Sequence, residues 1–248
     1  MDEINYIYFI FFFLIILQSI VGVGILVIGT PSLLLLEYSI IEILSILLPI
    51  SILTSLLNLL IFNFIKTENK LNIDSEYKKL FYYFCIPSIF IGLIFLKSFN
   101  NYINFDYLVS AIILISIFLT NNKKYIYGVK KKSKIFILII TGIIHGLTNS
   151  GGSLMSLFFS SYQKKDQSRY NITYFYFYLV IFQYCAFIIM FNKKIYNFEL
   201  IFFIPILLTG VTIGNYLSKY INIEKFKLLI TSLSIIVCFA LLLWTQIV

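Results

Sequence analysis

The chain has 248 residues, of which 60% are hydrophobic, 19% aromatic and only 12% charged, and its mean hydropathy is +0.95. Soluble domains carry about a quarter charged residues, so this composition excludes an ordinary soluble protein. In a membrane protein, basic residues mainly indicate how the chain is oriented across the bilayer. We interpret the formal net charge of +8 in this way and therefore expect no nucleic-acid partner.

The charges fall in clusters that separate eight long uncharged tracts. Each tract is close to or longer than the about 17 to 25 residues that a helix needs to cross a bilayer, and continuous apolar runs differ from the short alternating segments of a membrane β-barrel. We therefore predict an all-α, polytopic membrane protein with about eight transmembrane helices. The tracts are Ile4 to Leu36, Ile43 to Ile65, Leu80 to Leu96, Tyr107 to Asn122, Ile135 to Gln163, Tyr170 to Asn192, Leu200 to Ser218 and Leu228 to Val248.

The first tract, Ile4 to Leu36, is too long for one straight span. As a single helix it would extend about 50 Å, against about 30 Å of hydrocarbon. Its length and the acidic N-terminus before it argue against a cleaved signal peptide. We expect the helix to break where glycines precede a Gly-Thr-Pro sequence, because proline removes a backbone donor. The candidate substrate-binding residues of this first broken segment are Gly22, Gly24, Gly29, Thr30 and Pro31.

Four polar residues of the second tract fall at positions i, i+3, i+4 and i+7, which places them on one face of a helix. A polar stripe in a membrane helix either lines a path or joins helices by hydrogen bonds, and we favour the path. The candidate path-lining residues are Ser51, Thr54, Ser55 and Asn58, together with Thr173 and Gln183 of the sixth tract.

The fifth tract contains the most polar segment at membrane depth, from Gly142 to Ser153. Irregular backbone at this depth must be buried in protein or line a cavity. Glycine amides and helix N-termini bind anions without a formal charge, and hydroxyl and amide side chains complete such a site. Close helix packing through Gly142-x3-Gly146 is the alternative, although packing does not require an Asn beside three hydroxyls. The predicted substrate-binding residues here are Thr148, Asn149, Ser150, Gly151, Gly152 and Ser153.

The only histidine, His145, lies inside this second broken segment. An ionisable residue within a span is a functional candidate, and imidazole titrates near neutral pH, which suits proton coupling. A neutral, hydrogen-bonded core role is equally open. Cys85, Cys185 and Cys238 lack paired ligand spacing, so we expect neither disulfides nor a metal site. We expect no cofactor.

Two parts of the chain repeat the same spaced residues, which indicates an internal duplication. We expect two homologous halves, residues 1–122 and 123–248, each with four helices and a break in the first. Four spans per half would give both halves one orientation, whereas a re-entrant segment would invert them. In the eight-span arrangement Lys-rich loops favour cytoplasmic termini. The matching groups are Pro87-x4-Gly92 with Pro205-x4-Gly210, and Tyr102-Ile103-Asn104 with Tyr220-Ile221-Asn222, offset by the same number of residues.

The glycine-containing break before Pro31, its second copy at Gly142 to Ser153 and the matching ends of the halves resemble the sulfite exporter TauE/SafE family. That family consists of duplicated anion transporters of bacterial membranes, and the resemblance covers nearly the whole chain. The first motif keeps only Gly22 and Gly24 of the family's usual three or four consecutive glycines. His145 stands where relatives often carry another polar or acidic residue. The resemblance implies transport of sulfite, an organosulfonate or a related carboxylate across a bacterial inner membrane.

We therefore expect a secondary transporter that holds a small oxyanion between the two breaks, with no Lys or Arg deep in a span. Its partners would be the lipid bilayer, the anion and protons or another coupling ion. The alternatives are a gated pore, a non-transporting scaffold subunit, and a serine hydrolase using Ser150 or Ser153 with His145. The hydrolase lacks a Gly-x-Ser-x-Gly motif and an orienting acid, so we expect no enzyme.

Overall fold

The computed structural model describes residues 2–22, 25–64, 71–121, 131–192 and 200–222, and beyond them residues 224, 228, 232, 235–236 and 238–244. Every regular element in these ranges is a helix, which confirms the all-α prediction. Residues 238–244 are also helical. The elements are α1 (Asp2–Val21), α2 (Ile25–Leu34), α3 (Ile40–Phe64), α4 (Ser75–Leu80), the π-helical turn η1 (Phe81–Cys85), α5 (Ile86–Phe99), α6 (Phe105–Asn121), α7 (Lys131–Thr148), α8 (Gly152–Tyr162), α9 (Lys165–Phe191) and α10 (Leu200–Tyr220).

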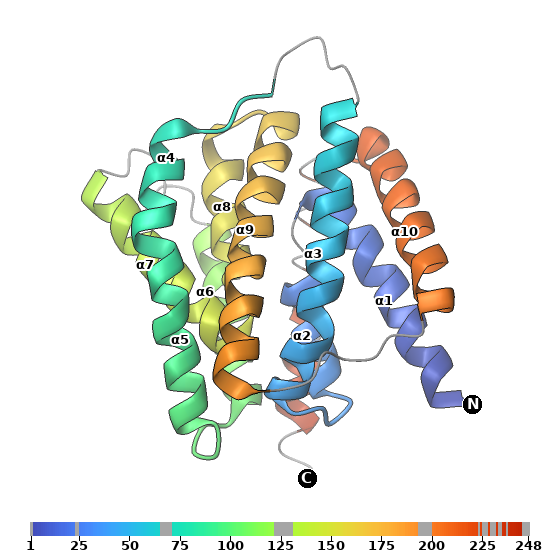
Figure 1. Ribbon diagram of the computed structural model, residues 1–248, viewed down its shortest axis with the longest axis vertical. Coiled ribbons are helices and arrows are strands. Elements are labelled where there is room, and N and C mark those ends of the chain that lie inside the picture. The colour runs from blue at the N-terminus through green and yellow to red at the C-terminus, as the bar shows by residue number, and fades with distance from the viewer. Residues whose placement is uncertain are drawn as a thin grey trace.

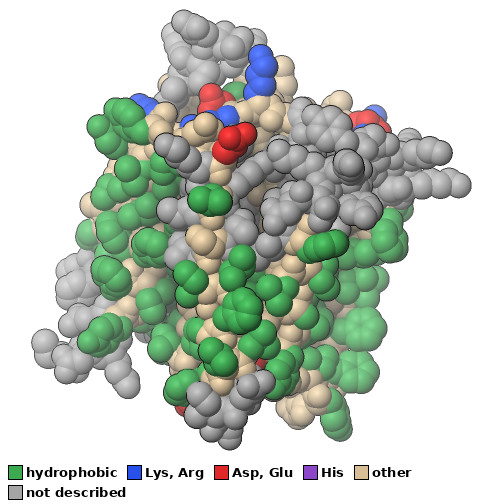
Figure 2. Space-filling view, turned by 180° about the vertical axis from the view of Figure 1, so that it is seen from behind, with side chains coloured by type: hydrophobic (Ala, Val, Ile, Leu, Met, Phe, Trp, Pro, Cys, Tyr) green, Lys and Arg blue, Asp and Glu red, His purple; other side chains and the backbone are tan. Residues whose placement is uncertain are grey.

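Three of the described helical stretches are long and apolar enough to cross a membrane: Ile40–Phe64, Ser75–Phe99 and Lys165–Phe191. Shorter apolar helices cover Tyr6–Val21, Phe105–Ile115 and Lys134–Thr148. Hydrophobic side chains cover most of the face seen in Figure 2, and charged side chains gather mainly near its upper end. The chain is therefore a multi-pass membrane protein, whereas the count of eight spans remains a prediction.

The first uncharged tract breaks after Val21, within the segment predicted to break, and forms a hairpin of α1 and α2. A Cβ atom on Gly29 of α2 would lie 2.9 Å from Leu14 of α1, so α2 folds back along the helix that precedes it. The reversal follows Gly22, whose φ of 93° is accessible to glycine without steric cost. This explains how so long an apolar tract fits a bilayer.

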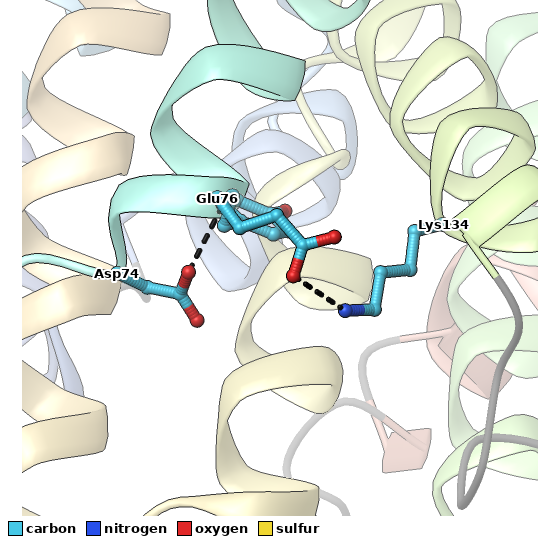
Figure 3. A network of polar contacts seen from close by, with 4 residues as sticks. Asp74, Glu76 and Lys134 are labelled. Atoms are coloured by element: carbon cyan, nitrogen blue, oxygen red, sulfur yellow. Dashed lines mark hydrogen bonds and ion pairs between the residues drawn. The ribbon is translucent and has the colours of Figure 1, made fainter.

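A second hairpin joins α7 and α8. Lys134, near the start of α7, pairs with Glu76 over 3.5 Å, so α7 begins beside α4. At the other end of the hairpin, Phe159 of α8 packs on the Tyr77 ring of α4 with ring centroids 4.5 Å apart. Figure 3 shows Glu76 and Lys134 together with Asp74, which caps α4 by accepting a hydrogen bond of 2.9 Å from the Tyr77 amide. The chain thus leaves and returns to the same end of the bundle.

Glycines allow two pairs of parallel helices to pack closely. Gly142 of α7 lies against the carbonyl of Cys85 at the end of η1, and Gly146 lies against that of Ile89, one turn further along in α5. Gly210 of α10 packs in the same way on α1, where an added Cβ would lie 2.8 Å from Ile15 Cγ2. Gly142 and Gly146 therefore serve helix packing, which was the alternative explanation for their spacing.

α9 lies at the centre of the bundle, between α1, α3 and α10 on one side and α5 and α7 on the other (Figure 1). It runs antiparallel to α3: Ser51 contacts Tyr176, and Phe62, further along α3, contacts Tyr170, earlier in α9. Both hairpin turns pack against this helix, so α9 positions the two predicted binding segments relative to each other.

Candidate functional site

The first break is built around Gly22. Its amide donates a hydrogen bond of 2.7 Å to the Gln18 carbonyl, and its backbone then turns into the left-handed region. An added Cβ would lie 2.6 Å from Thr173 Oγ1 of α9. Glycine is therefore required at this position, both for the backbone conformation and for the close approach to α9. Gly24, also predicted to bind substrate, lies outside the described residues.

The other residues predicted for the first break lie inside α2. Gly29 packs between Leu14 and Leu47, and Pro31 is buried within the helix. Thr30 is also buried, and its hydroxyl has no hydrogen-bond partner among the described residues. Of these three residues, Thr30 is the one with a side chain that could bind a ligand.

The second break spans Asn149 to Gly151, several residues later than Gly142, because α7 continues as a helix through Thr148. Asn149 has a φ of 67°, and its amide donates to the His145 carbonyl over 2.9 Å. Gly152 and Ser153 form the first turn of α8, where the Ser153 amide donates to the Ser150 carbonyl over 3.2 Å.

The hydroxyls predicted to bind substrate at this break contact local backbone carbonyls. Thr148 Oγ1 donates to the Ile144 carbonyl over 2.9 Å, and Ser150 Oγ donates to the Thr148 carbonyl over 3.3 Å. Ser153 Oγ donates to the Ser150 carbonyl over 2.7 Å. These bonds stabilise the turn, and a hydroxyl oxygen that donates retains its capacity to accept.

Four buried side chains converge beside the second break and form what we call the second-break cluster: Thr141, His145, Asn149 and Gln183. Gly151 folds back against Thr141 and His145 of α7, and Gln183 of α9 donates to the His145 carbonyl over 2.8 Å.

Six side-chain atoms of this cluster have no hydrogen-bond partner within the described part of the chain. They are Thr141 Oγ1, both ring nitrogens of His145, both amide atoms of Asn149 and Gln183 Oε1. Buried polar atoms in proteins almost always have partners, because each unpaired group costs about 1–3 kcal/mol. Such a concentration of unpaired polar atoms indicates a place where a ligand or water completes the hydrogen bonding.

A continuous series of buried polar side chains, which we call the polar line, connects this cluster to the first break: His145, Tyr176, Ser51 and Gln18. The rings of His145 and Tyr176 meet edge to face with centroids 6.1 Å apart. The Ser51 hydroxyl lies 3.2 Å from that of Tyr176 and 3.0 Å from Gln18 Oε1. Gln18 is in turn the residue whose carbonyl accepts from Gly22.

The model of the sulfite exporter TauE/SafE family matches residues 7–241 of the 248. The chain belongs to the TauE/SafE family. The family is one of sulfite exporters, so membership implies that the chain moves sulfite or another small anion across a membrane. No curated protein and no solved structure gives a significant match to the chain.

In this TauE/SafE protein the polar stripe of α3 occupies one buried face, as predicted, and most of its side chains make hydrogen bonds to other helices. The stripe consists of Ser51, Thr54, Ser55 and Asn58. Ser55 accepts from Gln18 of α1 over 2.8 Å. Asn58 donates to Ser19 of α1 over 3.1 Å and accepts from Asn215 of α10 over 2.7 Å. Thr54 donates to the Ile50 carbonyl over 2.8 Å within its own helix.

The other two candidates for lining a path lie apart on α9. Thr173 contacts the first break and Gln183 the second, and their separation of ten positions corresponds to about 15 Å along the helix. The lining of a path by any of these side chains remains a prediction.

The geometry gives no support to hydrolase chemistry in this TauE/SafE protein. The Ser150 hydroxyl donates to the Thr148 carbonyl, and neither ring nitrogen of His145 bonds to a serine in the described ranges. A nucleophile and its base must lie within hydrogen-bond reach. Within the same ranges, no group of His, Cys, Asp or Glu could hold a metal ion.

Sequence reasoning missed Thr141, Gln18 and Tyr176. Thr141 precedes His145 by one helical turn and Asn149 by two, so the i, i+4, i+8 spacing on one face could have indicated it. Gln18 is an amide within an apolar tract and could have been recognised in the same way. Tyr176 carried no such signal, because it lies in a run of aromatic residues and only packing distinguishes it from its neighbours.

Proposed function

We propose that the chain is a secondary transporter that moves sulfite, an organosulfonate or a related small carboxylate across the bacterial inner membrane. The observation that carries this proposal is the second-break cluster, whose six unpaired polar atoms lie in the protein interior. An oxyanion accepts several hydrogen bonds at once, and its binding would satisfy donors that otherwise remain unpaired.

Binding at this cluster would use neutral donors and one titratable group. The side-chain amide of Asn149 is a neutral donor, and it lies beside the N-terminus of α8, where the partial positive charge of a helix favours anions. His145 would add a positive charge when protonated, which strengthens its hydrogen bonds to an anion. Coupling of anion and proton transport follows, because each ligand then favours binding of the other.

Alternating access would come from two halves of opposite orientation, residues 1–122 and 123–248, and we propose that both termini are cytoplasmic. In support, each half begins with a hairpin, and α5 and α7 run parallel, as do α1 and α10, whereas α3 and α9 are antiparallel. An inverted repeat of this kind allows the binding site to open first to one side of the membrane and then to the other.

The test is uptake of labelled sulfite into proteoliposomes, with and without an imposed pH gradient. We expect gradient-dependent uptake by the wild type, and loss of the dependence on the gradient in His145→Ala. Thr212→Ala is the matched control, because Thr212 is exposed on α10 and its hydroxyl bonds only to carbonyls of its own helix. That variant should transport like the wild type.

The outcomes separate the parts of the proposal. Uptake that survives in His145→Ala with its gradient dependence intact would reject the proton role and leave the transporter. If neither sulfite nor organosulfonates and small carboxylates are transported or bound by folded wild-type protein, the proposal is wrong and the scaffold alternative is favoured.

A further inference from the structure

Arg169 is the only arginine in the chain, and it lies inside α9 although its sequence position suggested a loop. α9 begins at Lys165, so the guanidinium group enters the bundle one turn below the end of a span-length helix. The helix therefore starts five residues before Tyr170, where the uncharged tract begins. The first turn of α9 is hydrophilic, so the uncharged tract did not include it.

The guanidinium group of Arg169 joins three other helices near the first break. Its Nη2 donates to the Ser19 carbonyl of α1 and, over 2.6 Å, to Asn215 Oδ1 of α10. The group also lies over the Phe62 ring of α3, 4.8 Å from the ring centroid. Ser19 lies one turn before Gly22, and the Arg169 carbonyl accepts from Thr173, which packs on Gly22. The charge is therefore fixed beside the hairpin turn.

This positive charge is only partly compensated: Asp166, one turn earlier on α9, acts on it electrostatically but forms no ion pair with it in the part of the chain that the structure describes. Nε of Arg169 is buried and has no hydrogen-bond partner in the part of the chain that the structure describes. Within the same part, the one ion pair joins Lys134 to Glu76 and does not involve Arg169. Carbonyl dipoles and an aromatic ring offset less of a buried charge than a carboxylate does. A negative ligand would supply the missing counter-charge.

The two breaks differ in how the end of the preceding helix is capped. The C-terminus of a helix carries a partial negative charge, which repels an anion. At the second break the His145 carbonyl receives two neutral donors, the Asn149 amide and Gln183 Nε2. At the first break the end of α1 receives a full positive charge from Arg169, which more than cancels the partial charge of the helix end. Only this break is thereby made electropositive by a fixed cation.

We propose that Arg169 determines the charge selectivity of the transporter, by holding the anionic substrate at the first break through its guanidinium group. This inference rests on the proposed function, and it assigns the two breaks different tasks. The first break holds negative charge, and the second supplies hydrogen bonds and a titratable group.

The experiment compares Arg169→Gln, Arg169→Lys and Lys165→Gln for sulfite uptake in proteoliposomes and for sulfite binding in detergent. Lys165 is the matched control: it lies one turn earlier on α9, and its ammonium group donates to the Ser218 carbonyl and, over 2.9 Å, to the Ile221 carbonyl at the end of α10. Loss of a charged hydrogen bond predicts that Arg169→Gln raises the KM and Kd for sulfite about tenfold or more. Arg169→Lys should recover most of the affinity, and Lys165→Gln should leave it unchanged.

A structural role alone predicts a different pattern. Arg169→Gln and Lys165→Gln would then both lower the thermal unfolding midpoint, and the sulfite KM of the folded fraction would stay at the wild-type value, which overturns the inference. Absence of sulfite binding by the wild type would instead count against the proposed function, so the two failures are distinguishable.

A chemical test on the wild type covers the case in which Arg169→Gln does not fold. Phenylglyoxal modifies arginine, and this chain has a single target, so intact-mass spectrometry reports on Arg169 directly. A saturating concentration of a small organosulfonate, which does not react with phenylglyoxal as sulfite does, should slow the modification several-fold, whereas the same concentration of a neutral sugar should not. A modification rate that is the same with and without the organosulfonate, zero included, rejects the assignment.

Discussion

The hydroxyl groups of Ser51 and Tyr176 lie 3.2 Å apart where α3 crosses α9, and both side chains are fully buried. Ser51 continues to Gln18 at the first break, and Tyr176 packs on His145 at the second. Two side chains from opposite halves of the chain thus connect the two predicted binding segments. We expect any coupling between the breaks to depend on this contact.

Tyr176→Phe should interrupt the polar line without disturbing the packing of the ring. We expect a loss of about 1 kcal/mol in stability, since one buried hydrogen bond disappears, and a larger fall in gradient-driven sulfite uptake. Tyr178→Phe is the control, because Tyr178 lies on the same helix and contacts Tyr82 and Tyr174 away from the polar line. Equal uptake by both variants would contradict a role for the line in transport.

Asn149 combines a left-handed backbone with an unpaired buried amide, and two substitutions separate these properties. Asn149→Gly keeps the backbone conformation and removes the amide, so we expect a near-normal unfolding midpoint and weak sulfite binding. Asn149→Ala also strains the backbone, at a cost of about 1–2 kcal/mol. Thermal unfolding and sulfite binding in detergent check both. Wild-type binding in folded Asn149→Gly would remove this side chain from the site.

Gly22→Ala should destabilise the first hairpin in two ways. A left-handed backbone costs about 1–2 kcal/mol for a residue with a Cβ, and the new methyl group would meet Thr173 Oγ1 at 2.6 Å. The double variant Gly22→Ala with Thr173→Ala relieves the contact but not the backbone strain, so it should regain only part of the lost midpoint. Full recovery would show that the backbone conformation carries no cost here.

Gly146→Ala should damage the α5–α7 pair more than Gly210→Ala damages the α1–α10 pair. At Gly146 the added methyl group meets the Ile89 carbonyl, which cannot move without shifting α5, whereas at Gly210 the nearest atom is a side-chain methyl of Ile15. We expect a cost of about 1–3 kcal/mol or more at Gly146. Unfolding midpoints of the two purified variants test the order.

Much of this architecture could be predicted from the sequence because the bilayer restricts the choices. Long uncharged tracts can only be helices in lipid, so the helical class and the need for interruptions near Gly22 and somewhere between Gly142 and Ser153 followed directly. The polar stripe from Ser51 to Asn58 was also recognisable, since helical periodicity alone places its residues on one buried face.

What the sequence by itself determined is therefore the helical class, the family and the segments that cannot continue as straight helices. Only the tertiary structure decided that the chain turns back after Gly22, that the second break falls at Asn149, and that Arg169 lies beside the first break. The physical reason is that periodicity acts within one helix, whereas these features arise from contacts between helices. Hydrogen bonds from Arg169 to α1 and α10 join residues far apart in the chain, and nothing local in the sequence specifies them.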